Sequence, residues 1–172
     1  GQRLLASYDS ETIDPLGNVT KIKWYGATYT GDSVFYGGDG TNANKNITGY
    51  TQEVTDELGN TTKVVFQDAT YSGKLLASYN REITDNLGNV TKEQFSNPTY
   101  DDKNRLIGYH MITTDTFGNV TTTDRVSTSY NDNGLVTDYT EIVKDQQGNS
   151  TTREWHGQYN HLDQLTGYSQ KD

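Results

Sequence analysis

The sequence contains no cysteine, and it also lacks any long run of apolar residues. The absence of cysteine excludes disulfide bonds and cysteine-rich metal sites. No apolar run approaches the roughly 18 residues that a membrane-spanning helix needs, so membrane insertion is not expected. Hydrophobic residues make up only 31% of the 172 residues, whereas about 45–50% is usual for a globular domain. A thick two-layer core is therefore not expected.

Basic residues are also scarce, because 14 lysines and arginines stand against 23 acidic residues. The resulting net charge of -9 repels a phosphate backbone, which argues against nucleic acid as a partner. The same charge favours solubility and attracts cations or basic surfaces.

Disorder does not explain the low apolar content. Tyrosine, valine, isoleucine and threonine recur at regular positions, and disordered segments are poor in such residues. The composition instead predicts a thin or hollow sheet, in which backbone ladders and cross-strand pairs of Tyr, Thr and Val provide much of the order.

The strongest positive signal is a phrase that occurs five times. Residues 14–20 read DPLGNVT, and related sequences occupy 56–62, 85–91, 115–121 and 145–151. The intervals between successive glycines of this phrase are 42, 29, 30 and 30 residues, so the first interval carries an insertion; these glycines are Gly17, Gly59, Gly88, Gly118 and Gly148. A fixed period predicts an array of one small structural unit.

We predict that residues 1–172 form a single repeat array. Its units are approximately 1–46 with an insertion at 30–46, then 47–74, 75–104, 105–134 and 135–164, with 165–172 starting a sixth. Residues 1–8 nearly copy 73–79, and the last residues stop in nearly the same phase. We therefore expect this chain to be a segment of a longer repetitive protein, since natural arrays carry atypical end units.

The repeated phrase has the chemistry of a hairpin turn. Asp at the first position and Gly at the fourth fit a type I turn followed by a left-handed residue, and Pro15 presets φ at the second position. This combination forms a G1 bulge, which is a common hairpin connection. Strand-like segments rich in Thr and Val flank the turn, for example 106–114 and 120–130. The predicted fold class is all-β: tandem antiparallel β-hairpin repeats of about 30 residues that form an extended or spiralling sheet.

Aromatic residues repeat with the same period. A tyrosine precedes each turn aspartate by six residues, and an aromatic follows four of the five turn glycines by seven, as Trp24, Phe66, Phe95 and Trp155; Arg125 takes this place in the fourth unit. Two interpretations remain open. The stripe is a packing ladder along the sheet, or it is a row of sugar-stacking platforms whose ligand-binding residues are Trp24, Trp155, Tyr79 and Tyr109.

The turns also contain Asn-x-Thr/Ser sequences, which are acceptor sites for N-linked glycans in organisms that modify them. The candidate asparagines are Asn18, Asn60, Asn89, Asn119 and Asn149, and Asn46 lies in a sixth such sequence. The alternative is that Gly-Asn closes the turn and Thr begins the strand. We expect the structural interpretation.

Catalytic and metal-binding patterns are weak. The segment 37–46 resembles a calcium loop through Asp39 and Thr41 but lacks the terminal Glu, so we expect an ordinary loop. The histidines His110, His156 and His161 have no metal-ligand spacing. Catalysis depends on one unique constellation, whereas the conspicuous polar residues here are copied in every unit. We therefore expect no enzyme activity, no cofactor and no metal site.

A family resemblance is carried by residues 100–106, YDDKNRL, and more loosely by 130–135, YNDNGL. These sequences resemble the motif of Rhs/YD-repeat proteins, in which Tyr-Asp is followed by a short turn and then Arg-Leu. The resemblance implies a long spiralling sheet of successive hairpins in large bacterial surface or secreted proteins. Three features depart from the family pattern: the unit is longer, Asn104 stands where glycine is expected, and most units lack a strict Tyr-Asp pair.

These observations lead to an expected function. We expect a structural or adhesive segment of a large extracellular or cell-surface repeat protein of bacterial type, forming a fibre or stalk and associating with itself or with neighbouring repeats. The alternatives are a glycan-binding repeat module that uses the Trp/Tyr stripe on a polysaccharide, and a shell segment of a toxin-delivering Rhs-like protein.

Overall fold

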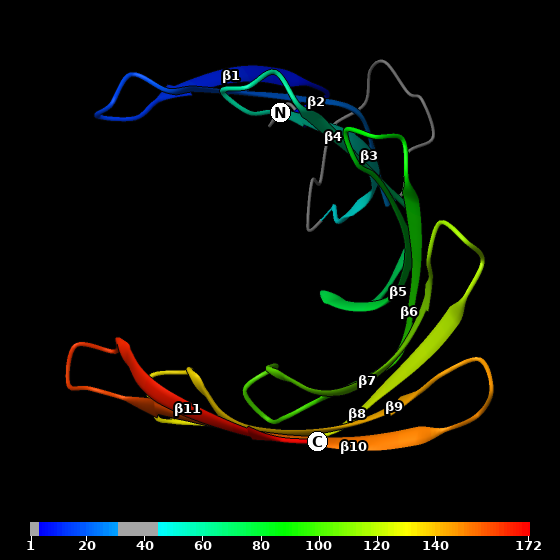
Figure 1. Cartoon of the computed structure of the whole chain (residues 1–172), viewed down its shortest axis with the longest axis vertical. Helices are drawn as coiled ribbons and strands as arrows, with labels where there is room; N and C mark the ends of the chain where they lie inside the picture. Colours follow the sequence, from blue (N-terminus) through cyan, green and yellow to red (C-terminus); the bar gives the residue numbers. More distant parts are fainter. Residues whose placement is uncertain (1–3, 31–44) are drawn as a thin grey trace, which may run out of the picture. The chain divides into compact units, whose positions relative to one another are not determined.

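The computed structural model describes residues 4–30 and 45–172, and within them the secondary structure is entirely β. The strands follow one another in one antiparallel sheet in the order of the sequence (Figure 1). They are β1 (Tyr8–Ile13), β2 (Val19–Tyr29), β3 (Ile47–Thr55), β4 (Thr61–Ser72), β5 (Leu75–Thr84), β6 (Val90–Tyr100), β7 (Leu106–Thr114), β8 (Val120–Tyr130), β9 (Val136–Lys144), β10 (Ser150–Tyr159) and β11 (Leu165–Lys171).

The predicted fold class of tandem antiparallel hairpins is confirmed. The strands expected at 106–114 and 120–130 coincide with β7 and β8. The calcium-loop candidates Asp39 and Thr41 lie outside the described residues.

The chain divides into two compact units, Gly1–Lys92 and Glu93–Asp172. The first contains β1 to β5 and the start of β6, and the second contains the remainder of β6 and β7 to β11. Each unit is described by itself below. The repeat boundaries expected from the sequence stay a prediction.

In each of four hairpins, the two strands are hydrogen-bonded from the turn at least as far as one pair of opposite residues, which recurs at the same distance from the turn. In the first unit these pairs are Tyr8 with Trp24 and Tyr50 with Phe66. In the second unit they are Tyr109 with Arg125 and Tyr139 with Trp155. The periodic aromatics therefore meet because the turn fixes the register of the two strands that it joins.

Alternation along the strands gives the sheet two different faces. The rings of Trp24, Tyr50 and Phe66 lie on one face, which we name the ladder face. The cross-strand neighbours Asp9, Lys23 and Glu53 lie on the other, which we name the charged face. Neither face is covered by a second layer in the described part of the chain, and no described side chain is fully buried.

Beyond the recurring cross-strand pairs, or one pair later at Asp138 and His156 in the hairpin of β9 and β10, the two strands of a hairpin separate and pair with other strands. Bulges mark the change of register, for example between Gln67 and Thr70 of β4 and between Arg125 and Ser127 of β8. Asp68, within the bulge of β4, adopts a left-handed backbone conformation with φ 57°, and Asn97, nine residues after its turn glycine as Asp68 is, has φ 52°. Asp and Asn tolerate this conformation better than most residues, which explains their use at these positions without glycine.

A tyrosine bridges the separated strands at the open end of each of four hairpins. The hydroxyl donates to a backbone carbonyl at the start of the same hairpin, over 2.5 to 2.8 Å; the pairs are Tyr29 with Leu5, Tyr71 with Ile47, Tyr130 with Leu106 and Tyr159 with Val136. The second tyrosine of the repeat therefore closes the end of the hairpin that the turn does not hold.

Three glycines test separately the conformational and steric demands of this fold. Gly118 has φ 83° and open space around its Cα, so Gly118→Ala costs about 1 kcal/mol through backbone strain alone. A Cβ on Gly108 would lie 2.9 Å from the Arg125 carbonyl oxygen, so Gly108→Ala costs more, about 2 kcal/mol. The control Gly167→Ala meets nothing closer than 3.7 Å and should change the unfolding free energy by less than about 0.5 kcal/mol.

Chemical denaturation of the three variants measures these differences. Equal losses in all three would contradict the assignment of the turn and of the close approach.

Candidate functional site

The turns hold themselves together with one aspartate each. Asp56 Oδ1 accepts hydrogen bonds from the backbone N–H groups of Leu58 and Asn60, and Asp56 Oδ2 accepts from Asn60 Nδ2 at 2.9 Å. The Gly59 N–H donates to the Asp56 carbonyl, and the Asp56 N–H donates to the Asn60 carbonyl. With Gly59 at φ 84°, this is a type I turn followed by a G1 bulge.

All five copies of the turn share this arrangement. The glycines have φ values of 83° to 88°; they are Gly17, Gly59, Gly88, Gly118 and Gly148. The aspartate of each turn accepts the same three hydrogen bonds, with donor–acceptor distances of 2.7 to 2.9 Å. The five turn aspartates are Asp14, Asp56, Asp85, Asp115 and Asp145. The repeated polar residues are thus used inside the turn.

These hydrogen bonds favour the ionised form of the aspartates. The Asn60 side-chain amide lowers the pKa of Asp56 most, and its backbone N–H adds to the effect. The side-chain amide is also the main cause of the lowered pKa of Asp85, Asp115 and Asp145. For Asp14 the backbone N–H of Asn18 is the main cause of the lowered pKa.

The five candidate glycosylation asparagines lie at the hairpin tips, and each uses its amide nitrogen within its own turn. Asn18, Asn60, Asn89, Asn119 and Asn149 all donate from Nδ2 to the turn aspartate. Two of them also link neighbouring tips, because Asn60 Oδ1 accepts from Asn86 and Asn119 Oδ1 accepts from Gln146. This geometry favours the turn-closing role, and glycosylation stays a prediction.

A second set of turns, which join one hairpin to the next, uses the same chemistry. Asp101, Asn131 and Asn160 each accept the backbone N–H groups two and four residues later. The left-handed position holds Asn104 at φ 62° and Asp163 at φ 60° as well as Gly134. Asn104 therefore occupies the conformation for which the family resemblance leads one to expect glycine.

The residues that carry the Rhs/YD resemblance have clear structural roles. Arg105 forms an ion pair with Asp101 at 2.6 Å and lies over the ring of Tyr130 at 4.5 Å from its centroid. The motif thus joins one turn to the tyrosine that closes the following hairpin.

A row of exposed apolar side chains occupies the third position of four turns. Each of these side chains is 80% to 87% exposed, and the four residues are Leu16, Leu58, Leu87 and Phe117. Sequence reasoning missed this row, although a bulky apolar residue at a turn position that does not require one was the available signal. Apolar side chains held outward by rigid turns are available for contact with another surface.

On the ladder face of the first unit, aromatic rings stack in an unbroken series. Tyr8, Trp24, Tyr50, Phe66 and Tyr79 follow one another with ring centroids 5.1 to 5.6 Å apart. Trp24, between two rings, is only 7% exposed. Such ring pairs contribute about 0.5–1.5 kcal/mol each beyond their buried area.

The ladder of the second unit includes an arginine. Phe95 packs against Tyr109 with ring centroids 5.5 Å apart, and Tyr139 packs against Trp155, which in turn packs against Tyr168. Arg125 lies between these two groups, with its guanidinium 5.4 Å from the Tyr109 centroid and 3.8 Å from that of Tyr139. A planar cation thus takes the place of an aromatic ring.

Arg125 has a carboxylate partner. Its guanidinium donates from Nε and an Nη atom to Glu141 Oε1 at 3.0 and 2.6 Å, and the Tyr109 hydroxyl donates to the same oxygen. Glu141 is only 6% exposed, and Arg153 lies 3.8 Å from its second oxygen. Burial raises the pKa of the Tyr109 hydroxyl.

The four candidate ligand-binding aromatics all lie in these ladders. Trp24 and Trp155 each have a ring on either side, Tyr79 faces Phe66, and Tyr109 lies between Phe95 and Arg125. Sugar stacking needs an uncovered ring face. The geometry therefore favours the packing interpretation, and ligand binding by these residues stays a prediction.

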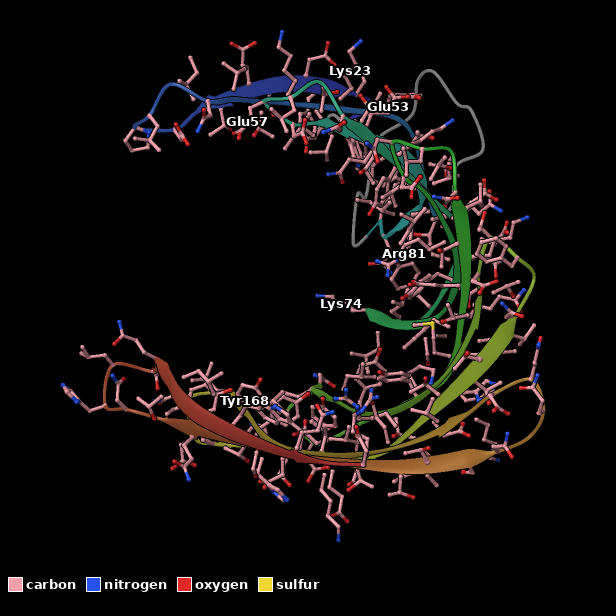
Figure 2. The ribbon with its side chains drawn as sticks, viewed as in Figure 1. Lys23, Glu53, Glu57, Lys74, Arg81 and Tyr168 are labelled. Atoms are coloured by element: carbon pink, nitrogen blue, oxygen red, sulfur yellow. The ribbon has the colours of Figure 1, made fainter. Side chains whose placement is uncertain are left out.

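The charged face of the first unit alternates in sign from strand to strand. Asp9, Lys23, Glu53 and Lys63 are successive cross-strand partners. Figure 2 labels Lys23 and Glu53 on this face, and Arg81 on the opposite, ladder face. Opposite charges on neighbouring strands stabilise their pairing by about 0.2–1 kcal/mol per pair.

Two of the three histidines pair with aspartates across strands. His110 Nδ1 lies 2.6 Å from Asp124 Oδ1, and His156 Nδ1 lies 2.6 Å from Asp138 Oδ1. The bond from His156 lowers the pKa of Asp138. In residues 4–30 and 45–172, no group of three or more His, Cys, Asp or Glu side chains is placed to hold a metal ion.

Neither a comparison with protein-family models nor one with curated proteins finds a match for this chain. Among the residues that the structure describes, none belongs to a helix with the length and apolar character needed to cross a membrane.

Replacement of Arg125 tests the buried ion pair within the ladder. Arg125→Phe completes the aromatic series but leaves Glu141 without its closest cation, so we expect a loss of about 2 kcal/mol in unfolding free energy. The double variant Arg125→Phe with Glu141→Gln should recover most of this loss, because Trp24 faces Gln52 in the same arrangement. Urea denaturation measures both, and a single variant as stable as the parent would refute the role of the pair.

The turn aspartates predict a loss of stability in acid. Their pKa values are lower in the folded chain than their ordinary value. Their contribution is therefore complete above an ordinary pKa of about 3.9 and disappears as the pH falls through the lower folded values. Thermal unfolding from about pH 7 to about pH 2 should show this decrease.

Asp85→Asn is the matched control for this pH dependence. Asn131 shows that an amide oxygen accepts the same two backbone bonds. The variant should therefore keep the turn and lose part of the decrease below pH 4 or so. An unchanged acid profile would contradict the assignment.

Proposed function

We propose that this chain is a structural and adhesive segment of a large extracellular repeat protein. The observation that carries the proposal is the use of the repeated side chains. Ladder rings cover one another, turn aspartates bond their own backbone, and hairpin-closing tyrosines bond carbonyl groups. Residues repeated for a ligand would present free faces and free polar atoms, whereas these residues maintain the sheet.

A sheet of this kind suits a spacer. Four hairpins carry their own turn, a fixed cross-strand pair on the ladder face and a closing tyrosine. A sheet of such hairpins can be lengthened by adding hairpins without enlarging a common core. The acidic, cysteine-free composition is compatible with a stalk or fibre outside the cell. Membership of the Rhs/YD-repeat group is part of the proposal and rests on the Tyr100 and Tyr130 sequences.

The adhesive part of the proposal rests on the row of apolar hairpin tips. Leu16, Leu58 and Leu87 stand on successive tips of the first unit, each at least 80% exposed. The bond between Asn86 and Asn60 holds two of these tips together. Tips joined in this way present apolar side chains at a fixed spacing to a neighbouring surface.

Electron microscopy of native material that contains this chain tests the proposal. Fibres or thin rods are expected, and hollow closed particles would instead favour a toxin-enclosing shell. The triple variant Leu16→Ser, Leu58→Ser and Leu87→Ser should reduce lateral association of the fibres. It should change the unfolding free energy by less than about 1 kcal/mol, because the three side chains are exposed. Fibres that associate as strongly as the parent would remove the adhesive role.

The glycan-stripe alternative has its own measurement. A polysaccharide that stacks on Trp24 or Trp155 should shift and quench tryptophan fluorescence, and we expect no change across a glycan panel.

A further inference from the structure

In a repeat array, a residue that breaks the period is more informative about function than one that obeys it. The position after the ladder tyrosine holds a different kind of residue in most of the five sequence repeats; these residues are Asp9, Thr51, Asn80, His110 and Thr140. In the fourth repeat, the cross-strand partner of His110 is Asp124. The neighbouring Arg125 also breaks the period, since it stands in the place of an aromatic residue. These departures coincide within one hairpin, β7 and β8.

A depression lies at this hairpin, wholly within the second unit. It has a volume of about 450 Å³ and is lined by residues of four strands, which include Asn97, Thr99, His110, Asp124, Val126 and Ile142. Gly108 lies at the same place, where a Cβ would come within 2.7 Å of Thr99 Oγ1 and 2.9 Å of the Arg125 carbonyl oxygen. The backbone here therefore excludes a side chain that would fill the depression.

The lining supplies oriented hydrogen-bonding groups. An ionised carboxylate only accepts, so Nδ1–H of His110 donates to Asp124, and this bond fixes the ring. Nε2 of His110, the second oxygen of Asp124, the Asn97 amide and the Thr99 hydroxyl have no hydrogen-bond partner within the described part of the chain. Beside them lie Ile142 and Val126, the latter 55% exposed.

We propose that this depression binds a neutral sugar residue. Sugar hydroxyl groups both donate and accept, which matches an imidazole nitrogen, an amide, a hydroxyl and a carboxylate oxygen placed close together. The C–H face of a sugar ring matches the apolar pair Val126 and Ile142. The carboxylate of Asp124 disfavours an acidic sugar. His110, Asp124 and Ile142 belong to the charged face, and Tyr109 and Arg125 of the ladder also border the depression. The proposed binding uses neither a ring face nor the hairpin tips, so it goes beyond the proposed structural role and is independent of it.

The chain contains its own control for a binding experiment. His156 and Asp138 form the same pair at the same 2.6 Å distance, but they are absent from the lining of the depression. We suggest titrating the whole chain with glucose, galactose, mannose and N-acetylglucosamine to about 100 mM, which covers millimolar affinities. Imidazole resonances of the three histidines are followed by NMR. We expect at least one sugar to shift the His110 signals saturably, while His156 and tryptophan fluorescence do not respond.

Two variants identify the site. Asn97→Gly removes the amide while suiting the left-handed backbone at φ 52°, and Asp68→Gly makes the equivalent change at φ 57° in the first unit. Asn97→Gly should weaken binding about tenfold, since one or two hydrogen bonds are lost. Asp68→Gly should leave binding unchanged, and glucuronate should bind more weakly than glucose.

Any of three outcomes in the titrations of His110 would overturn the proposal: no saturable shift with any of the four sugars, equal shifts of His110 and His156, or equal binding by Asn97→Gly and the parent. A change in tryptophan fluorescence that accompanies binding would place the sugar on the ladder instead, and would also overturn it. None of these results bears on whether the native material forms fibres, so failure here is distinct from failure of the structural proposal.

Discussion

Contact between side chains along the sheet is the interaction on which the rest of this structure depends. Without a covering layer, an apolar ring can be removed from water only by its neighbours on the same face. Trp24 shows that this is effective, because two tyrosines reduce its exposed fraction to 7%. The low hydrophobic content of the sequence is consistent with this arrangement, since one ladder residue on each strand, an aromatic or, on β8, Arg125, is enough to form the ladder.

The ladder in turn demands an accurate register. A slip of one residue would move every ring to the charged face, so each hairpin is fixed at both ends. At one end the aspartate, asparagine and glycine form the G1-bulge turn, and at the other a tyrosine hydroxyl reaches across to a carbonyl group. The alternating charges of Asp9, Lys23, Glu53 and Lys63 favour the same register on the opposite face. Independent local devices therefore support a single arrangement.

Most of the repeated side chains are used to maintain the sheet. The periodic polar residues are engaged with their own backbone, and the periodic rings are engaged with each other. In the described part of the chain, the residues not used in this way include the apolar side chains at the tips and the residues around His110 and Asp124. These two features differ in kind: the tips repeat and suit contact along a surface, whereas the proposed sugar site at His110 suits a small ligand.

The sequence by itself determined the local structure. The turn, its glycine conformation and the flanking strands 106–114 and 120–130 depend on contacts within a few residues, so composition and spacing are sufficient to predict them. The period of the aromatic residues was also visible in the sequence, and the structure shows that it brings Tyr8 opposite Trp24. Only the tertiary structure decided which atoms across neighbouring strands become partners. The pairing of Arg125 with Glu141 joins residues 16 apart, and the closing bond of Tyr71 to Ile47 joins residues 24 apart. The bulge at Asp68 and the depression at Gly108 arise where strands separate. That separation depends on several strands at once, which no short segment of sequence encodes.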